Sequence, residues 1–184
     1  MEDFSQLIKA CVSEDRKAQK KLYGLFASKM MMICLRYSKS EAEAEDILQE
    51  SFIKIFKNLK NLREYSNVAA WIKRIVINTA LNYQRSKLYL YPMVAVEHVK
   101  ISYDENTALS GFHHEELLKM IQELPLGCQV IFNLYAIEGY THKEIAAKLN
   151  ISEGTSKSQY SRAKSLLQSK LMESESGNYE RAER

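Results

Sequence analysis

The sequence predicts an all-α protein made of two small helical domains joined by a flexible linker. Apolar residues recur at intervals of three and four over most of the chain, which is the period of amphipathic helices. The 184 residues include only six glycines and two prolines, so helix-breaking residues are scarce. The helical rhythm lapses between the two halves. We therefore expect a first domain over 1–87, a linker over 88–114, a second domain over 115–172 and a charged tail over 173–184.

Three successive apolar stripes predict a helix-bundle core in the first domain. The helix that carries the third stripe has a polar opposite face, with Arg74, Asn78, Asn82 and Arg85 at spacings of four, four and three. Trp71 and Tyr83 on the same helix are expected to be core residues. The stripes consist of Leu22, Leu25, Phe26, Met30, Ile33, Cys34 and Tyr37, then Ile47, Leu48, Phe52, Ile55, Phe56 and Leu59, then Trp71, Ile72, Ile75, Val76 and Thr79.

The segment 88–114 lacks the helical period and contains a proline and a glycine, which is typical of a linker. A short strand through Val94, Val96, Val99 and Ile101 is an alternative for this segment, although no partner strand is evident. Helical periodicity returns in the second domain at Leu117, Leu118, Ile121, Val130, Ile131, Leu134 and Tyr135.

The composition is that of a soluble globular protein, with 46% hydrophobic and 27% charged residues. No apolar run approaches membrane-spanning length and no signal pattern opens the chain, so we expect a cytoplasmic protein without membrane insertion. Cys11, Cys34 and Cys128 are scattered and odd in number, which fits a reducing compartment. His113 and His114 have no cysteine pair nearby, so neither a metal site nor a cofactor is expected.

The net charge is only +3, but the charges are unevenly distributed. Residues 41–50 hold five acids and no base, whereas residues 73–87 and 155–170 each hold four bases and no acid. Any one such run can be a solvated helix face. Two acid-free basic helices in a nearly neutral chain instead favour binding to nucleic acid.

The stretch GYTHKEIAAKLNISEGTSKSQYSRAK, residues 139–164, predicts two short helices joined by a tight corner. Thr141 and Glu144 form a capping box, and Asn150 tolerates the left-handed conformation that ends a helix. Ser152 then caps the second helix. An ordinary helical hairpin with the same caps is the alternative to a DNA-binding helix-turn-helix. The residues expected on one exposed face, as on a recognition helix that reads base edges, are Lys157, Ser158, Ser161 and Arg162.

Two parts of the chain resemble one known family. LPLGCQVIFNLYAIEGYTHKEIAAKLNISEGTSKSQYSRAKSLL looks like region four of the bacterial sigma-70 family, the domain that reads the minus-thirty-five promoter element. AEAEDILQESFIKIFKNLKNL, followed by WIKRIVINTALNYQRSK, resembles region two of extracytoplasmic-function (ECF) sigma factors. The two regions occur in the family's order and with a tether of the expected length.

The resemblance implies an ECF-type sigma factor that binds core RNA polymerase and promoter DNA and directs transcription initiation, without being an enzyme itself. It also implies an anti-sigma factor as a partner. The implied core polymerase contacts are Asp46, Gln49, Glu50 and Phe52. The implied minus-ten contacts are Leu62, Arg63, Arg74, Asn78, Asn82 and Arg85. For Trp71 and Tyr83, stacking on a base of the separated strands is the alternative to a core position. The implied minus-thirty-five contacts are Thr155, Lys157, Ser158, Gln159, Ser161, Arg162 and Lys164.

The chain departs from the family pattern at three places. The family usually has an aromatic-Arg-Gly loop where this sequence has residues 62–65, LREY, so the glycine of the family's base pocket is absent. In the predicted recognition helix, Ser156 replaces an apolar residue and Gln159 replaces a common arginine. The serine is expected to loosen helix packing, and the glutamine to remove a phosphate contact.

Two other classes of protein are alternatives. A two-domain helix-turn-helix regulator would bind DNA without being a polymerase subunit, but it would need a ligand pocket or a phosphoacceptor cluster, and neither is evident. An enzyme could use the carboxylates of residues 41–50. However, Glu41, Glu43 and Glu45 alternate, which spreads them around a helix, and no histidine or cysteine joins them.

Overall fold

The computed structural model describes residues 4–62, 67–90 and 114–182, and these ranges contain helices and no strand. The all-α prediction is therefore confirmed for the part of the chain that the structure describes. The chain divides into two compact units, Met1–Ser86 and Lys87–Arg184. Most of the predicted linker, including its alternative strand, lies outside the described residues.

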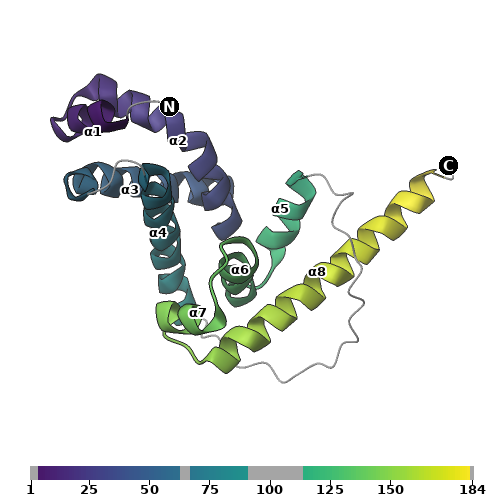
Figure 1. Cartoon of the computed structure of the whole chain (residues 1–184). Helices are drawn as coiled ribbons and strands as arrows, with labels where there is room; N and C mark the ends of the chain where they lie inside the picture. The colour runs from purple at the N-terminus through teal and green to yellow at the C-terminus, as the bar shows by residue number, and fades with distance from the viewer. Residues whose placement is uncertain (1–3, 63–66, 91–113, 183–184) are drawn as a thin grey trace. The chain divides into compact units, whose positions relative to one another are not determined.

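The first unit is a helical bundle built from consecutive segments of the chain (Figure 1). Its elements are α1 (Phe4–Val12), α2 (Arg16–Tyr37), α3 (Glu41–Asn58), the 3-10 turn η1 (Leu59–Asn61) and α4 (Val68–Leu90). Two of the helices begin at side-chain caps. The Asp15 carboxylate accepts hydrogen bonds from the backbone N–H groups of Lys17 and Ala18 at 2.7 and 2.9 Å, and the Ser40 hydroxyl accepts from Glu43 N–H at 3.2 Å.

The predicted apolar stripes form the core of this unit. Leu22, Ile47, Ile55, Ile72 and Val76 are fully buried, as period-3.6 patterning requires of helices packed on one side. The prediction for Leu25 is wrong, because its side chain is 38% exposed. It lies one position outside the stripe that Leu22 and Phe26 define.

The second unit contains α5 (His114–Glu123), α6 (Leu126–Phe132), the single π-helical turn η4 (Asn133–Ile137), α7 (His142–Leu149) and α8 (Glu153–Ala182). A core cluster joins α5, α6 and α8 through Ile121, Leu124, Cys128, Ala163 and Leu167. Tyr135, which the periodicity placed in the core, is 38% exposed. The π-helical turn, which begins two residues earlier, shifts the helical phase there.

The corner between α7 and α8 has the predicted caps. Thr141 accepts a hydrogen bond from Glu144 N–H at 3.3 Å, and the Glu144 carboxylate accepts from Thr141 N–H at 2.8 Å, so the capping box is complete. The hydrogen bond from Thr141 N–H, and secondarily the one that the Thr141 hydroxyl donates to the same carboxylate, lower the pKa of Glu144. Asn150 ends α7 in the left-handed region at φ 57°, and Ser152 accepts from Thr155 N–H at 2.9 Å to start α8.

None of the helices within the described ranges is long and apolar enough to span a membrane. No cluster of potential metal-ligating side chains occurs among the same residues.

Candidate nucleic-acid interfaces

Helix α4 presents a row of polar side chains to solvent. Arg74, Asn78, Asn82 and Arg85 are all exposed, and we call this row the amide face. The opposite side of the helix is buried through Ile72, Val76, Thr79 and Ala80. A helix with one buried side and one polar side holds its exposed groups in fixed register. Trp71 and Tyr83 are only half-buried, so both are less deeply buried than core residues.

A buried glutamine fixes α4 against the end of α2. Gln84 is fully buried, and its side-chain N–H donates to the carbonyl oxygen of Tyr37 at 2.6 Å. Tyr37 is the last residue of α2, so its carbonyl has no partner within that helix. The bond thus connects residues 47 apart in the sequence and sets the position of the neighbouring Arg85.

Of the other predicted minus-ten residues, Leu62 is half-buried at the end of η1. Arg63 lies outside the described residues, as does the rest of the loop in which the family's glycine is replaced. The structure therefore brings four of the six predicted residues to one helix face and leaves Leu62 on a separate element.

Helix α3 carries the predicted acidic surface. Asp46, Gln49 and Glu50 are exposed, and we call these three residues the acidic face. Glu50 pairs with Lys54 one turn later, at 2.6 Å. The fourth predicted residue, Phe52, is only 3% exposed and packs against Tyr23 with ring centroids 4.6 Å apart. A direct contact of Phe52 with polymerase stays a prediction, and in the structure its ring joins α3 to α2.

A shallow groove of about 380 Å³ runs beside the acidic face, between α2 and α3. Tyr23, Met31 and Leu48 supply its apolar part, and Glu45 and Gln49 its polar part. Tyr23 is 41% exposed, and Ile53 on α3 is 54% exposed. Sequence reasoning missed both residues. Both could have been found in the sequence, because each is an apolar residue that lies outside the buried stripe of its own helix. Exposed apolar residues of this kind are typical of surfaces that contact a partner.

Helix α8 has a narrower exposed face than the sequence predicted. Lys157 and Arg162 are exposed, and Ser161 and Lys164 are half-buried; we call these four residues the recognition face. The Lys164 ammonium lies 5.5 Å from the centre of the Tyr160 ring, which orients it. Lys157 pairs with Glu153 at 2.8 Å, and this hydrogen bond lowers the pKa of Glu153.

Three predicted DNA contacts, Thr155, Ser158 and Gln159, are buried. The Ser158 hydroxyl donates to the Thr155 carbonyl oxygen at 3.1 Å. The Gln159 side-chain oxygen accepts from the Cys128 thiol of α6 at 3.0 Å. The first two turns of α8 contact both α6 and α7. These two helices together cover more of the α8 surface than a single packing partner would. Direct DNA contact by these three side chains stays a prediction, and in the structure they are packed within the second unit.

Ser156, which stands where the family has an apolar residue, is also fully buried. Its hydroxyl lies 2.9 Å from Nδ1 of His142, the first residue of α7. The His142 ring stacks on Tyr135 at 4.2 Å between centroids and meets Tyr160 edge-on. Burial, and secondarily the charge of Lys157, lower the pKa of His142. The expectation that Ser156 loosens the packing is not supported, because a polar contact replaces the apolar one.

Comparisons with known proteins match both structural units. The family model described as Sigma-70 region 2 matches residues 22–88, and the one described as Sigma-70, region 4 matches residues 114–167. The ECF RNA polymerase sigma-E factor of Escherichia coli (strain K12) is 28% identical over 177 residues, which is 90% of this chain and 92% of that protein. The sigma-E factor of Haemophilus influenzae is 26% identical, over 90% of this chain and 93% of that protein.

A solved structure shows the same fold. It is the sigma factor RpoE in complex with the anti-sigma factor NepR from Bartonella quintana, at 23% identity and a TM-score of 0.51, over 83% of this chain and 96% of that chain. The two family models match the two structural units in order, and the sigma-E factors match along nearly the whole length. The chain is therefore a member of the sigma-70 family and belongs to its ECF group.

Proposed function

We propose that this chain binds core RNA polymerase through the first unit and directs initiation at promoters that both units read. The catalysis of RNA synthesis stays with the polymerase, and the chain contributes recognition. The observation that carries the proposal is that each unit presents its own basic, acid-poor helix face while only the first unit presents the acidic face. A protein that merely bound duplex DNA would have no use for the acidic face.

The acidic face and the neighbouring groove are the proposed polymerase contact. Exposed carboxylates steer a basic partner and fix its register, while buried apolar area supplies affinity. Tyr23 and Ile53 flank the acidic face and provide exposed apolar side chains of this kind. Phe52 contributes from behind, because its ring supports Tyr23.

The amide face of α4 is the proposed reader of the minus-ten element. A carboxamide offers a donor and an acceptor side by side, which suits the edge of an exposed base, so Asn78 is assigned to a base. The arginines of the row are assigned to phosphates. On the recognition face, Arg162 is assigned to a base edge and Lys157 and Lys164 to phosphates, as on other helix-turn-helix proteins.

An anti-sigma factor is the proposed inhibitory partner. The structurally similar RpoE was solved together with the anti-sigma factor NepR. Any protein that covered the acidic face or the recognition face would block the steps assigned to them.

The polymerase assignment is tested by charge reversal on the acidic face. We expect Asp46→Arg together with Glu50→Arg to weaken core binding by about 2–5 kcal/mol, because reversal adds repulsion to the loss of attraction. Helicity should not change, since both side chains are exposed. The measurement is the dissociation constant for core polymerase, by titration with a labelled chain.

The matched control is Glu115→Arg with Glu173→Arg, which makes the same change in net charge on exposed residues of the second unit. If both double variants lose the same affinity, the effect is one of overall charge. If neither loses affinity, the acidic face is not the polymerase contact.

The alternative, a helix-turn-helix regulator that acts without polymerase, is less well supported. It gives no role to the acidic face or to its groove. A pull-down of core polymerase separates the two, because a regulator of that kind would not retain the enzyme.

A further inference from the structure

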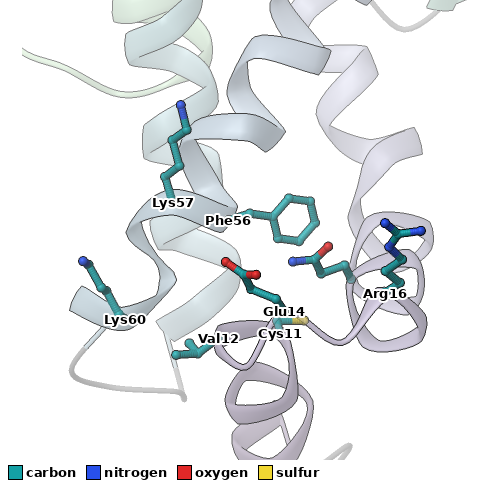
Figure 2. A pocket seen from close by; sticks show the side chains of 8 residues that line it. Cys11, Val12, Glu14, Arg16, Phe56, Lys57 and Lys60 are labelled. Carbon is teal, nitrogen blue, oxygen red and sulfur yellow. The ribbon is translucent and has the colours of Figure 1, made fainter.

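A second cavity, of about 490 Å³, lies in the first unit on residues to which no role has been assigned. It is bounded by the turn between α1 and α2 on one side and by the end of α3 with η1 on the other (Figure 2). Its volume falls in the range of small-ligand sites. The side chains that carry chemistry there are Glu14, Arg16, Gln19, Phe56, Lys57 and Lys60.

Three cations from three different elements line the cavity, and Figure 2 shows the Arg16 guanidinium on the opposite side from the Lys57 and Lys60 ammonium groups. Arg16 opens α2, Lys57 lies in the last turn of α3, and Lys60 belongs to η1. All three are exposed, and no ion pair joins them to a carboxylate within the described ranges. Against the one acid, Glu14, the cavity wall therefore has an excess of positive charge. This excess favours an anionic ligand, and a phosphate group in particular.

The interior of the cavity suits a flat ring. Phe56 is half-buried and its ring projects into the opening (Figure 2), 6.0 Å from the Phe52 ring behind it. A phenyl face exposed beside cations is a stacking platform for a nucleobase, since every base has a π-face. Gln19 adds a side-chain amide, which both donates and accepts hydrogen bonds.

Glu14 occupies a backbone position that normally favours glycine. Its φ is 62°, in the left-handed region, and it follows α1, with its N–H donating to Cys11 O at 3.1 Å. A side chain there costs conformational energy that a glycine would avoid. The carboxylate points into the opening (Figure 2). As a pure acceptor, it can bind the exocyclic amine of adenine, cytosine or guanine, whereas thymine has no such amine.

We propose that this cavity binds a nucleotide whose base stacks on Phe56, whose exocyclic amine donates to Glu14, and whose phosphate lies on the side of the cavity that carries Lys57 and Lys60. The position of the cavity indicates the source. Lys60 lies two residues before Leu62, the first of the predicted minus-ten contacts. The ligand is therefore a nucleotide of the separated promoter strand adjacent to the minus-ten element. This source rests on the proposed function, whereas the affinity for a nucleotide does not.

The chemistry is tested on the full chain with dCMP and dTMP as probes, by calorimetric titration. The wild type is expected to bind dCMP several-fold more tightly than dTMP. Glu14→Gly should bring that ratio close to one, with an unchanged or higher Tm because glycine suits the left-handed backbone. Loss of the ratio therefore cannot be attributed to unfolding.

The phosphate site is tested with Lys60→Gln against Lys29→Gln, a change at an exposed lysine of α2 outside the cavity. Lys60→Gln should weaken both probes several-fold and Lys29→Gln neither. Equal binding of dCMP and dTMP by the wild type, equal responses to the two lysine variants, or no binding at all would overturn the proposal.

The source is tested with the chain assembled on core polymerase and a single-stranded oligonucleotide that carries a minus-ten element and single abasic positions downstream. We expect one abasic position to reduce affinity several-fold for the wild type and not for Glu14→Gly. If the wild type binds dCMP more tightly than dTMP but no abasic position lowers the affinity for the oligonucleotide, the promoter strand is not the source of the ligand. The ligand is then a free nucleotide. If the chain does not assemble on core polymerase, the proposed function fails, and the mononucleotide titration still decides the chemistry of the cavity.

Discussion

Helices α4 and α8, which the proposed function assigns to DNA, differ in how much of their surface is left for a ligand. Helix α4 is buried along one side and leaves the complete amide face exposed. Helix α8 begins between α6 and α7, and four residues of its first two turns, Thr155, Ser156, Ser158 and Gln159, are buried. Within the recognition face that remains, Lys157 and Arg162 are exposed and Ser161 and Lys164 are half-buried.

This difference indicates a division of work between the units. A long row of amides and arginines can follow several nucleotides of a strand, and it suits bases that have left the duplex. A short face with one exposed arginine and one exposed lysine suits a few contacts to the edge and backbone of an intact major groove. The first unit should therefore act mainly when strands separate, and the second mainly when the duplex is first bound.

The largest effect on the second unit is expected from Arg162→Ala. If Arg162 reads a base edge, the change should cost about 1–3 kcal/mol and relax the preference at one or two base pairs. Lys164→Ala is the matched comparison, because Lys164 is half-buried over Tyr160 and is assigned to phosphate. It should reduce affinity evenly over all sequences. The affinities of both variants for a library of upstream elements decide between the two roles. If Arg162→Ala lowers the affinity evenly over all sequences, Arg162 contacts phosphate and does not read a base.

Asn78→Ala is the corresponding test of the first unit. It should reduce open-complex formation by about tenfold while leaving initial binding nearly unchanged, because its carboxamide is assigned to a base that becomes accessible only after melting. The measurement is the rate of permanganate reactivity at the start site, alongside the affinity for closed duplex. An equal loss in both quantities would mean that α4 reads duplex DNA, and the proposed division of work would then be wrong.

A smaller effect is expected from pH, through His142 in the second unit. The pKa of His142 is lowered in the fold by burial, so the folded state disfavours the charged ring more than the unfolded state does. Below the ordinary value of 6.5 the unfolded chain binds the proton first, and stability falls as the pH decreases through the lowered pKa. Above pH 6.5 the His142 ring is neutral in both the folded and the unfolded state, so its full contribution to the free energy of unfolding is present.

The variant His142→Gln should remove this part of the pH dependence. The measurement is the free energy of unfolding of the second unit between pH 7 and pH 5. Identical pH profiles for the wild type and the variant would show that the contacts of His142 with Ser156 and Tyr135 do not depend on its charge state.

Sequence periodicity predicted α4 better than α8 for a physical reason. A helix packed on one side has one buried stripe, and spacings of three and four identify both that stripe and its polar counterpart, as Val76 and Asn78 show. A helix packed on two sides buries polar residues as well. Which polar residues are buried depends on the neighbouring helices, so the helix's own sequence does not identify them. Gln159 is an example, because its burial depends on Cys128, which lies 31 residues away.

Local chemistry was equally informative at the helix ends. The capping box at Thr141 and the left-handed Asn150 involve residues three or fewer positions from the helix end, so the sequence determines them directly. The cavity around Phe56 could not be predicted in this way. It joins residues 11–19 to residues 56–60, and neither segment alone has a pattern that indicates a ligand.

We propose that helices α4 and α8 read promoter DNA together only when the chain is bound to core polymerase. Each has about four positive charges, so either unit alone would neutralise few phosphates and bind weakly. The direct measurement is promoter binding and run-off transcription by the full chain with and without core polymerase. We expect weak duplex binding and no transcript from the chain alone, and specific run-off transcripts with core polymerase. Tight, site-specific duplex binding by the chain alone, with no transcript when core polymerase is added, would contradict the account and favour a regulator that works without the enzyme.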